Sequence, residues 1–379
     1  MKNPLLRTFL YFFLLTCGLR VSATTYYLSA AGNDLNNGLT PATAWQTLAH
    51  LNDQIPGVQP SDRILLRRGD TFQGSLELFL SGGNGSPVIV GAYGTGPLPV
   101  INGAISVTGW VLHSGNIYRA AMPRAVKMLF ADNKRMTLAR YPNTGWLFTD
   151  VGFGVNGFRD AGIAQPSGYW NGGQVHLRTV DWQYEMRTVQ SQVNGDVIFQ
   201  NPTDYGVNAN WGYFLSNKLA ALDAPGEWYY DAGTSQLYFY APGGVHPATL
   251  SVEAVVEEVG VDLGNNANYL AVQDLRIEKF ARNGLRLAGV SDGVSVSNCE
   301  IQWTGETGIH IDTYPAKNLL ISGNTITDAE GRGIYHYGAS QAEISGNVLK
   351  RVGMVPGYGL NVVNNGVGIL CYEGTENSL

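Results

Sequence analysis

Four side chains in the last third of the sequence are of the types that break glycosidic bonds. Glu306 and Glu330 lie 24 residues apart (330 minus 306), and His310 and Asp312 follow Glu306 closely. Hydrolysis of a glycosidic bond needs two carboxyl groups, about 5 Å apart for retention or roughly 6.5 to 9.5 Å apart for inversion. Asp312 paired with Glu330 or with Glu306 would meet these separations if the two residues lay on neighbouring turns of a coil. The alternative is that all three acids are solvated surface residues.

The same region offers groups for a second chemistry, β-elimination from a uronate polymer. That reaction needs a base near the sugar C5 and a cation, such as calcium or arginine, beside the uronate carboxylate. His310 could serve as the base. The arginines that could take part are Arg282, Arg286 and Arg332. Calcium is expected only for this alternative, and hydrolysis requires neither a cofactor nor a metal. The stretch DLNNG at 34–38 lacks EF-hand spacing and is predicted to be a turn.

These residues belong to an internal repeat. Segments that begin with glycine and an aliphatic residue recur with spacings of 24, 25 and 35 residues, and segments such as ISGNTI recur in step with spacings of 24, 25 and 23. Each unit contains short alternating apolar runs separated by Gly, Asn, Ser or Asp, which is typical of strands joined by turns. A fixed period of this size indicates a solenoid, in which a unit buries its apolar side chains only by stacking on its neighbours. The glycine segments start at Gly284, Gly308, Gly333 and Gly368.

We therefore predict an all-β fold, a right-handed parallel β-helix in which each unit of about 24 residues forms one turn of the coil, or rung. Neighbouring rungs would lie roughly 4.8 Å apart. A leucine-rich repeat has a similar period, but its consensus is missing and no unit shows helical periodicity. Asn324 and Asn347 occupy one rung position, either as a ladder of stacked amides or as ordinary turn residues.

Alternation along the strands assigns each side chain to a face. The inward residues are predicted to be Leu285, Leu287, Ile309, Ile311, Ile334 and His336, and the outward residues Arg286, His310, Asp312, Tyr335 and Tyr337. An outer sheet face forms a groove along which a polysaccharide can lie, so Arg286, Tyr335 and Tyr337 are the predicted substrate-binding residues. His336 is predicted to be a core histidine rather than a ligand.

The sequence before the repeat predicts two further regions. Residues 24–103 contain β runs joined by Gly/Pro turns and a short helix at about 43–51, which would cap the open first rung. Residues 104–252 lose the repeat and read as an inserted, antiparallel all-β module. Its many aromatic residues would either form its core or stack on sugar rings. Residues 253–379 carry the β-helix repeats, predicted to be incomplete at the C-terminus.

The first 23 residues have the form of a secretory signal peptide. Lys2 and Arg7 precede an apolar run that is too short to span a membrane, and Val21-Ser22-Ala23 is a small-x-small cleavage pattern. Lipid attachment at Cys17 is the alternative. Cleavage would change the formal charge from −6 to −9 (21 minus 30), because three basic residues and no acid are removed. A net-acidic chain disfavours nucleic acid and anionic lipid as partners.

Several phrases resemble a known family. YYLSAAGND at 26–34, PVIVGAYGTGPLPVING at 87–103, KRMTLARYPN at 134–143 and LDAPGEWYYD at 222–231 look like secreted bacterial proteins of the pectate-lyase-like β-helix superfamily. The last two phrases resemble its glycosidase-type members. The resemblance implies a carbohydrate-active β-helix, but none of the family's catalytic motifs can be matched residue by residue. The family's helix continues over several more rungs, so we expect a truncated chain whose catalytic rungs lie beyond Leu379.

These patterns together predict a secreted, periplasmic or cell-surface protein that acts on a polysaccharide and, after signal cleavage, has no membrane or nucleic-acid partner. A glycoside hydrolase acting on a plant or algal glycan is the leading interpretation. A polysaccharide lyase and a non-catalytic carbohydrate-binding or surface solenoid are the alternatives. The sequence indicates no oligomeric state.

Overall fold

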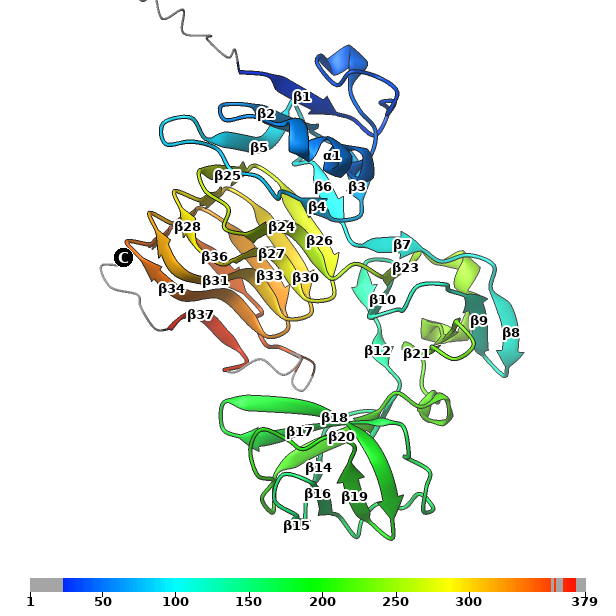
Figure 1. Cartoon of the computed structure of the whole chain (residues 1–379). Coiled ribbons are helices and arrows are strands. Elements are labelled where there is room, and N and C mark those ends of the chain that lie inside the picture. The colour runs from blue at the N-terminus through cyan, green and yellow to red at the C-terminus, as the bar shows by residue number, and fades with distance from the viewer. Residues whose placement is uncertain (1–22, 356–357, 359–363, 373–379) are drawn as a thin grey trace, which may run out of the picture.

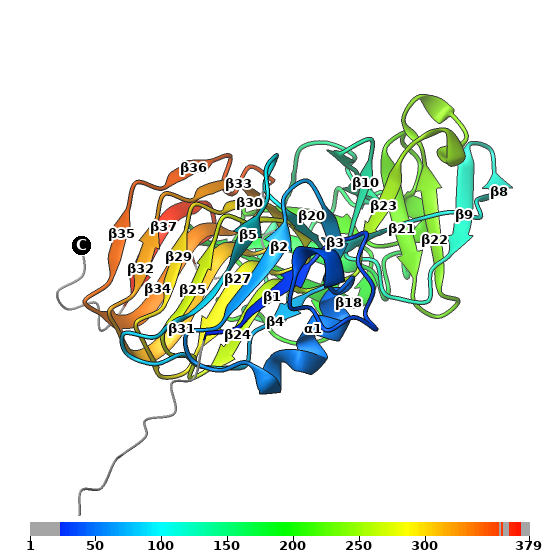
Figure 2. The same cartoon turned by 90° about the horizontal axis from the view of Figure 1, so that it is seen from above.

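The computed structural model describes residues 23–355, Tyr358 and 364–372. The predicted signal peptide therefore lies outside the described residues, apart from Ala23. Three parallel sheets wind through the described residues and form the walls of a coil (Figures 1 and 2). The first sheet contains β1 (Thr25–Leu28), β2 (Arg63–Arg67), β5 (Val88–Tyr93), β25 (Leu270–Gln273), β29 (Ser295–Ser297), β32 (Leu320–Ser322) and β35 (Glu343–Ser345). The second contains β3 (Thr71–Gln73), β6 (Val100–Asn102), β26 (Arg276–Phe280), β30 (Glu300–Thr304), β33 (Thr325–Ala329) and β36 (Val348–Lys350).

The third sheet carries the glycine segments of the repeat. Its strands are β4 (Leu76–Glu77), β24 (Val259–Asn265), β27 (Asn283–Ala288), β31 (Thr307–Lys317), β34 (Arg332–Ser340) and β37 (Val367–Tyr372), and β28 (Ser291–Asp292) pairs with β31 beside them. Leu285 pairs with Ile309, Ile309 with Ile334 and Ile334 with Ile369, all in parallel register. The predicted parallel β-helix is confirmed, because the glycine ladder becomes neighbouring strands of the third sheet and the other ladder becomes neighbouring strands of the first and second sheets.

Glycine recurs at one rung position because nothing larger fits there. A Cβ on Gly308 would lie 2.6 Å from Ile326 Cγ2 and 2.7 Å from the carbonyl oxygen of Gly333 on the next rung. Both distances are shorter than a Cβ contact allows, and one of the obstructing atoms belongs to the backbone. Gly284 and Gly333 meet equivalent obstacles. The repeat therefore begins with glycine where the chain enters the third sheet.

The inside of the coil is one continuous apolar core. The predicted inward residues of the third sheet are fully buried, and His336 lies among them. The predicted asparagine ladder also forms: the Asn324 side-chain amide donates to Asn347 Oδ1 at 3.0 Å, and Asn324 Oδ1 accepts from the Cys299 amide at 3.0 Å. These bonds run from rung to rung and satisfy polar groups that would otherwise be buried without partners.

The N-terminal cap differs in its bounds from the predicted helix at 43–51. The α-helix is α1 (Leu48–Gln54), followed by a 3-10 turn, η2 (Ile55–Gly57), and preceded by another, η1 (Pro41–Thr43). The chain between η1 and α1 is extended, and Thr47 caps α1 through its side chain, which accepts from the His50 amide. Leu48 and Leu51 join the apolar core of the coil, so the helix covers the first rung as predicted.

Strands of residues 104–255 form antiparallel sheets beside the coil (Figure 1). One contains β7 (Ala104–Ser106), β10 (Met128–Ala131), β11 (Lys134–Arg135) and β23 (Val252–Val255). A second contains β8 (Val111–Ser114), β9 (Ile117–Ala121), β12 (Thr137–Leu138), β21 (Glu227–Asp231) and β22 (Gln236–Tyr240), of which β12 and β21 run parallel. A third contains β13 (Arg140–Tyr141), β14 (Leu147–Phe148), β15 (Val151–Gly152), β16 (Gly157–Arg159), β17 (Gln174–Val180), β18 (Gln183–Val193), β19 (Asp196–Phe199) and β20 (Gly212–Ser216).

These sheets interrupt a single rung of the coil. The strand before the insertion, β6, pairs with β26, and the strand after it, β24, pairs with β4. The coil therefore still stacks in register on both sides of the insertion. The insertion has apolar cores of its own, one around Trp228 and Phe239 and another around Phe158 and Tyr213. Most of its aromatic residues therefore lie in these cores or pack against them, which was one of the two interpretations of the sequence.

Candidate active site

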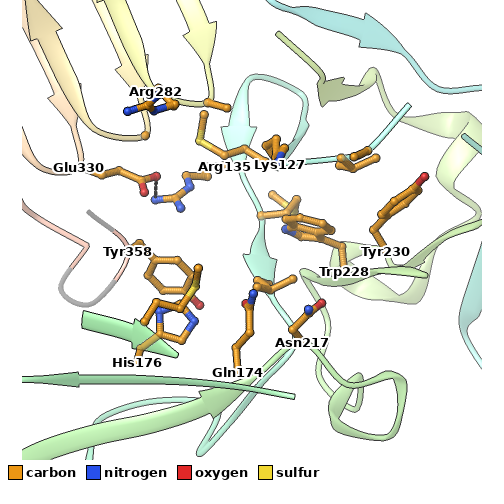
Figure 3. Close-up of a pocket in the computed structure, with 18 of the residues that line it drawn as sticks. Lys127, Arg135, Gln174, His176, Asn217, Trp228, Tyr230, Arg282, Glu330 and Tyr358 are labelled. Atoms are coloured by element: carbon orange, nitrogen blue, oxygen red, sulfur yellow. Dashed lines mark ion pairs between the residues drawn. The ribbon is translucent and has the colours of Figure 1, made fainter. Parts of the chain in front are cut away.

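A cavity of about 350 Å³ lies between the coil and the inserted sheets (Figure 3). We call it the junction cavity. The coil contributes the turns that connect its second sheet to its third, and the inserted sheets contribute strands β10 to β12, β17, β18 and β21. Its polar and aromatic lining residues are Lys127, Arg135, Gln174, His176, Asn217, Trp228, Tyr230, Glu258, Arg282, Glu330 and Tyr358.

Glu330 is the buried acid of the junction cavity. Its side chain is 7% exposed and forms an ion pair with the guanidinium of Arg135 (Figure 3). Burial raises the pKa of Glu330 from 4.5 to about 7, and the positive charge of Arg135 opposes that rise. Near neutral pH this carboxyl can therefore both give and take a proton, which is the property of a general acid or base.

The register of the coil explains the position of Glu330. The turn before each strand of the third sheet has Ala281, Gly305 and Glu330 at one rung position, since the following strands pair Asn283 with Thr307 and Thr307 with Arg332. Ala281 and Gly305 also line the junction cavity. Small residues on the two preceding rungs leave room beside the Glu330 side chain.

A tight hairpin in the insertion places Arg135. β10 and β11 pair antiparallel, and the two residues between them, Asp132 and Asn133, have φ values of 48° and 58°. Two left-handed residues in succession make a type I′ turn, which Asp and Asn tolerate better than most residues. The same turn is anchored to the coil, because Lys279 on β26 donates to Asn133 Oδ1 at 2.9 Å and to Glu253 Oε2 at 2.6 Å.

The cavity wall includes buried donors that have no hydrogen-bond partner among the described residues, and two of them belong to the insertion. They are the buried indole Nε1–H of Trp228 and the Nε–H of Arg135. Buried donors are nearly always bonded in native proteins, so these two are available to a ligand's oxygen atoms. The amide side chains of Gln174 and Asn217 and the ring of Tyr230 face the same space (Figure 3). Aromatic rings with a few convergent polar groups form a lining that suits a sugar.

Comparisons with known proteins agree on the architecture. Residues 259–378 match the family described as "Right handed beta helix region". The chain is a right-handed parallel β-helix protein. A solved glycoside hydrolase is similar over 94% of this chain and 96% of its own, with 14% identity and a TM-score of 0.58. The solved complex of XylC with xylose is similar over 93% of this chain and 57% of its own, with 13% identity and a TM-score of 0.52.

One curated relative is similar in sequence over a short segment. Lacto-N-biosidase of Bifidobacterium longum subsp. longum is 37% identical over 76 residues, which is 19% of this chain and 5% of that protein. The β-helix protein therefore matches only a small part of that relative's length. No helix within the described residues is both long and apolar enough to cross a membrane.

The predicted site residues of the β-helix protein divide into two groups. Glu330 lines the junction cavity. Glu306, one rung earlier, does not line it; its side chain is 7% exposed and accepts from Arg282 Nε at 3.0 and 3.1 Å. The others lie on the outer face of the third sheet: Arg286, His310, Asp312, Tyr335 and Tyr337. That face is where the alternation placed them.

The structure does not bring Asp312 and Glu330 together. Asp312 pairs with Tyr337, which lies five residues along β34 from Arg332. That distance along a strand is roughly 17 Å, well beyond the separation of about 9.5 Å that an inverting carboxyl pair allows. Glu330 lies in the turn before Arg332, farther away still. The sequence repeat gives the rung of each residue, but the separation along the strand decides which residues meet.

His310 is flanked by the positive charges of three arginines. Burial and the charges of Arg332, Arg282 and Arg286 lower the pKa of His310 to about 4. Each arginine has acidic neighbours of its own: Arg286 pairs with Asp262 at 3.0 Å, Arg282 pairs with Glu306, and the charges of Glu306 and Asp312 act on Arg332. The imidazole is therefore neutral at neutral pH, and the arginine charges are largely balanced.

The loop at 34–38 forms a turn in the structure. The Asp34 carboxylate accepts from the backbone amides of Gln46 and Thr47 at 2.6 and 3.0 Å, and from the Thr47 hydroxyl at 2.7 Å. Its oxygens hold the chain before α1. Over the described residues, His, Cys, Asp and Glu side chains form no group of three that could hold a metal ion.

Sequence reasoning missed the cavity residues of the insertion. Arg135, Gln174, His176 and Trp228 lie far from Glu330 in the chain and outside the repeat. One signal was present: Arg135 and Trp228 lie in the two phrases that resemble β-helix glycosidases, and these phrases pair as β12 and β21. Glu227 joins them, because its carboxylate accepts from the backbone amides of Arg140, Asp223 and Ala224.

Proposed function

We propose that the protein is a secreted glycoside hydrolase that cleaves a plant or algal glycan in the junction cavity, with Glu330 as the general acid. The observation that carries this proposal is the buried Glu330 carboxyl, whose pKa is raised to about 7 in a cavity lined by aromatic rings and unpartnered donors. A carboxylic acid in such an environment stays protonated near neutral pH and can protonate a leaving group.

The chemistry follows from that protonation state. Glu330 gives its proton to the glycosidic oxygen as the bond from that oxygen to the anomeric carbon breaks, so the leaving sugar departs with a free hydroxyl. A water molecule supplies the hydroxyl that the anomeric carbon gains, and a second carboxylate takes the proton of that water. Arg135 stabilises the carboxylate that remains on Glu330.

We assign the second carboxylate to Glu258, the other acid among the described residues that line the cavity. Its rung position is that of Arg282, Glu306 and Gly331, so it lies three rungs, or roughly 14 Å along the axis, from the turn that carries Glu330. Glu306 lies one rung from Glu330, but it does not line the cavity and its carboxylate accepts from Arg282. A base that acts on water across the cavity predicts inversion of anomeric configuration, which proton NMR of the first product would reveal.

Structural and sequence likeness supports a carbohydrate substrate without naming it. One solved structure with a similar overall fold is described as a glycoside hydrolase, and another is the complex of XylC with xylose. The segment shared with lacto-N-biosidase is short. The lyase alternative has less support, because a histidine whose pKa is about 4 is a weak base at neutral pH.

The test is hydrolysis of a panel that contains xylan, arabinan, galactan, mannan, laminarin, alginate, and the p-nitrophenyl glycosides of xylose and lacto-N-biose. We expect reducing-sugar or nitrophenol release from at least one of these by the wild-type protein and a loss of at least a hundredfold in Glu330→Gln. Glu300→Gln, an exposed acid on β30, is the matched control and should retain full activity. An unsaturated product absorbing in the ultraviolet would indicate elimination instead. Equal activity of Glu330→Gln and the wild type would refute the assignment.

A further inference from the structure

One face of the third inserted sheet is continuous with the junction cavity. Side chains of alternate residues on a strand lie on the same face. On β17, Val175 and Leu177 point into an apolar core, so Gln174, His176 and Arg178 point the other way. Gln174 and His176 line the junction cavity, and this face lies on the side of the sheet turned toward the coil (Figure 1).

Strand pairing shows which other residues share that face. His176 lies opposite Met186 on β18 and Phe214 on β20, and Arg178 lies opposite Tyr184. Directly paired residues of an antiparallel sheet point to the same side. Met186 also lines the cavity. Arg178 and Tyr184 lie one alternation farther along their strands, roughly 7 Å from His176 and Met186.

The aromatic rings on this face form a connected series that leads out of the cavity. His176 stacks on Phe214 with 4.4 Å between ring centres, Phe214 lies 5.3 Å from Trp146, and Trp146 stacks on Tyr184 at 5.7 Å. Arg140 fixes the series, since its guanidinium lies 3.7 Å from the centre of the Phe214 ring. We call Trp146, Phe148 and Tyr184 the outer platform.

The outer platform is the part of this series that meets solvent. Trp146 and Tyr184 are partly exposed, and Phe148, which pairs with Gly212 on the same face, is 58% exposed. Large exposed aromatic groups rimmed by polar side chains mark binding sites. Here Arg178 supplies the rim and lies 5.3 Å from the centre of the Trp211 ring.

We propose that the outer platform binds a sugar residue of the same chain that is cleaved at Glu330, so that the substrate is an oligosaccharide or polysaccharide rather than a simple glycoside. This rests on the proposed function for the site of cleavage. Continuity with the cavity favours this occupant: one end of a glycan enters the cavity, and the next residues stack over Trp146 and Tyr184. Flat aromatic rings accept the apolar faces of sugar rings, and Arg178 bonds their hydroxyls.

The experiment is binding and turnover across a length series. The probes are xylan, arabinan, galactan, mannan, laminarin and alginate oligosaccharides, each from the monosaccharide to the hexasaccharide, titrated into Glu330→Gln by calorimetry. We expect affinity for one series to increase with length and the gain to disappear in Trp146→Ala and Tyr184→Ala. Loss of one stacking partner should weaken hexasaccharide binding roughly tenfold and leave disaccharide binding within about twofold. Phe79→Ala, an exposed aromatic residue before the insertion, is the control.

The outcomes separate the two proposals. Length-dependent binding that requires Trp146, without hydrolysis of any probe by the wild type, would support the platform and refute the hydrolase. Hydrolysis with no length dependence, or length dependence that Trp146→Ala and Tyr184→Ala leave unchanged, would refute the platform alone. Binding to none of the series would also overturn it. Thermal melting of each variant, together with Trp146→Phe, distinguishes lost stacking from lost folding.

Discussion

At the scale of single residues, the Glu330 carboxyl is acted on by two opposing neighbours. The surrounding protein removes water from it and raises its pKa to about 7, and Arg135 partly reverses that rise. The balance sets the fraction of the acid that is protonated at a given pH. Arg135 and Glu330 can be substituted separately, so this ion pair gives two independent predictions.

The first concerns the pH dependence of activity. A general acid must be protonated, so kcat/KM should fall as the pH rises through about 7. Arg135→Met removes the charge that favours the ionised form, so the falling limb should move to higher pH, while Arg135→Lys should stay near the wild type. The measurement is the pH profile of kcat/KM for the best substrate. A limb that does not move in Arg135→Met would count against the ion pair as its cause.

The second concerns stability. The folded-state pKa of Glu330 lies above its unfolded value of 4.5, so the folded state holds a proton that the unfolded state loses as the pH rises. Glu330 therefore costs no stability below pH 4.5 and costs roughly 3 kcal/mol above about pH 7. Glu330→Gln lacks this dependence, so its free energy of unfolding should fall less than that of the wild type between these pH values. Urea titrations at several pH values test the difference in slope, and parallel slopes would contradict it.

At the scale of elements, the glycine positions control how closely the rungs stack. We expect Gly308→Ala to destabilise the coil by about 2 kcal/mol or more, because the added methyl would overlap Ile326 Cγ2 and the backbone oxygen of Gly333. Gly57→Ala is the matched control: nothing lies within 4 Å of its added Cβ, and the substitution should be neutral or stabilising by less than about 1 kcal/mol. Urea denaturation gives both values, and equal effects would show that stacking does not select glycine.

At the scale of the whole molecule, the junction between coil and insertion depends on a buried lysine. Lys279 is 1% exposed, pairs with Glu253 and lies 5.3 and 5.4 Å from the ring centres of Trp303 and Phe130. Through Asn133 and Glu253 this contact joins the coil to the hairpin that carries Arg135 and to β23.

Lys279→Met should therefore destabilise the protein by about 3 kcal/mol, because it leaves the Glu253 carboxylate without its partner. Adding Glu253→Gln should restore part of that loss. Arg159→Met, which breaks an exposed pair with Asp196, should cost far less stability because solvent screens that pair. The measurement is a double-mutant cycle by urea denaturation. If Lys279→Met were as mild as Arg159→Met, the junction would not depend on this ion pair.

Export of the chain is predicted to change one further contact. The Thr24 amide lies 2.7 Å from Oδ1 of the buried Asp62, and cleavage after Ala23 would turn that nitrogen into an ammonium group. Charge-assisted bonds are roughly twice as strong as neutral ones. Asp62→Asn should therefore lower the melting temperature more in the processed protein than in one that keeps an N-terminal extension. Mass spectrometry of the exported chain should give a first residue of Thr24, and any other start would contradict the prediction.

The sequence by itself determined the coil. Leu285, Ile309 and Ile334 stack in the predicted register, and Asn324 bonds to Asn347 as one of two interpretations expected. Every rung offers its neighbours the same environment, so the same residue types return at the same interval and the period is visible in the sequence. The helix bounds were less accurate, because the Thr47 cap and the extended stretch before it depend on Asp34, which lies in a separate turn.

Only the tertiary structure decided the site. Glu330 was a candidate from the start, but the pairing with Asp312 was considered because both residues repeat with the rungs, and the distance along β34 separates them. Arg135 pairs with Glu330, and Trp228 lines the same cavity, because the insertion leaves the coil before β24 and packs against the turns of rungs that follow later in the chain. Contacts between a repeat and a non-repeating insertion have no period, since each forms once, between segments distant in the chain. That is why the architecture could be predicted from the sequence and the junction cavity could not.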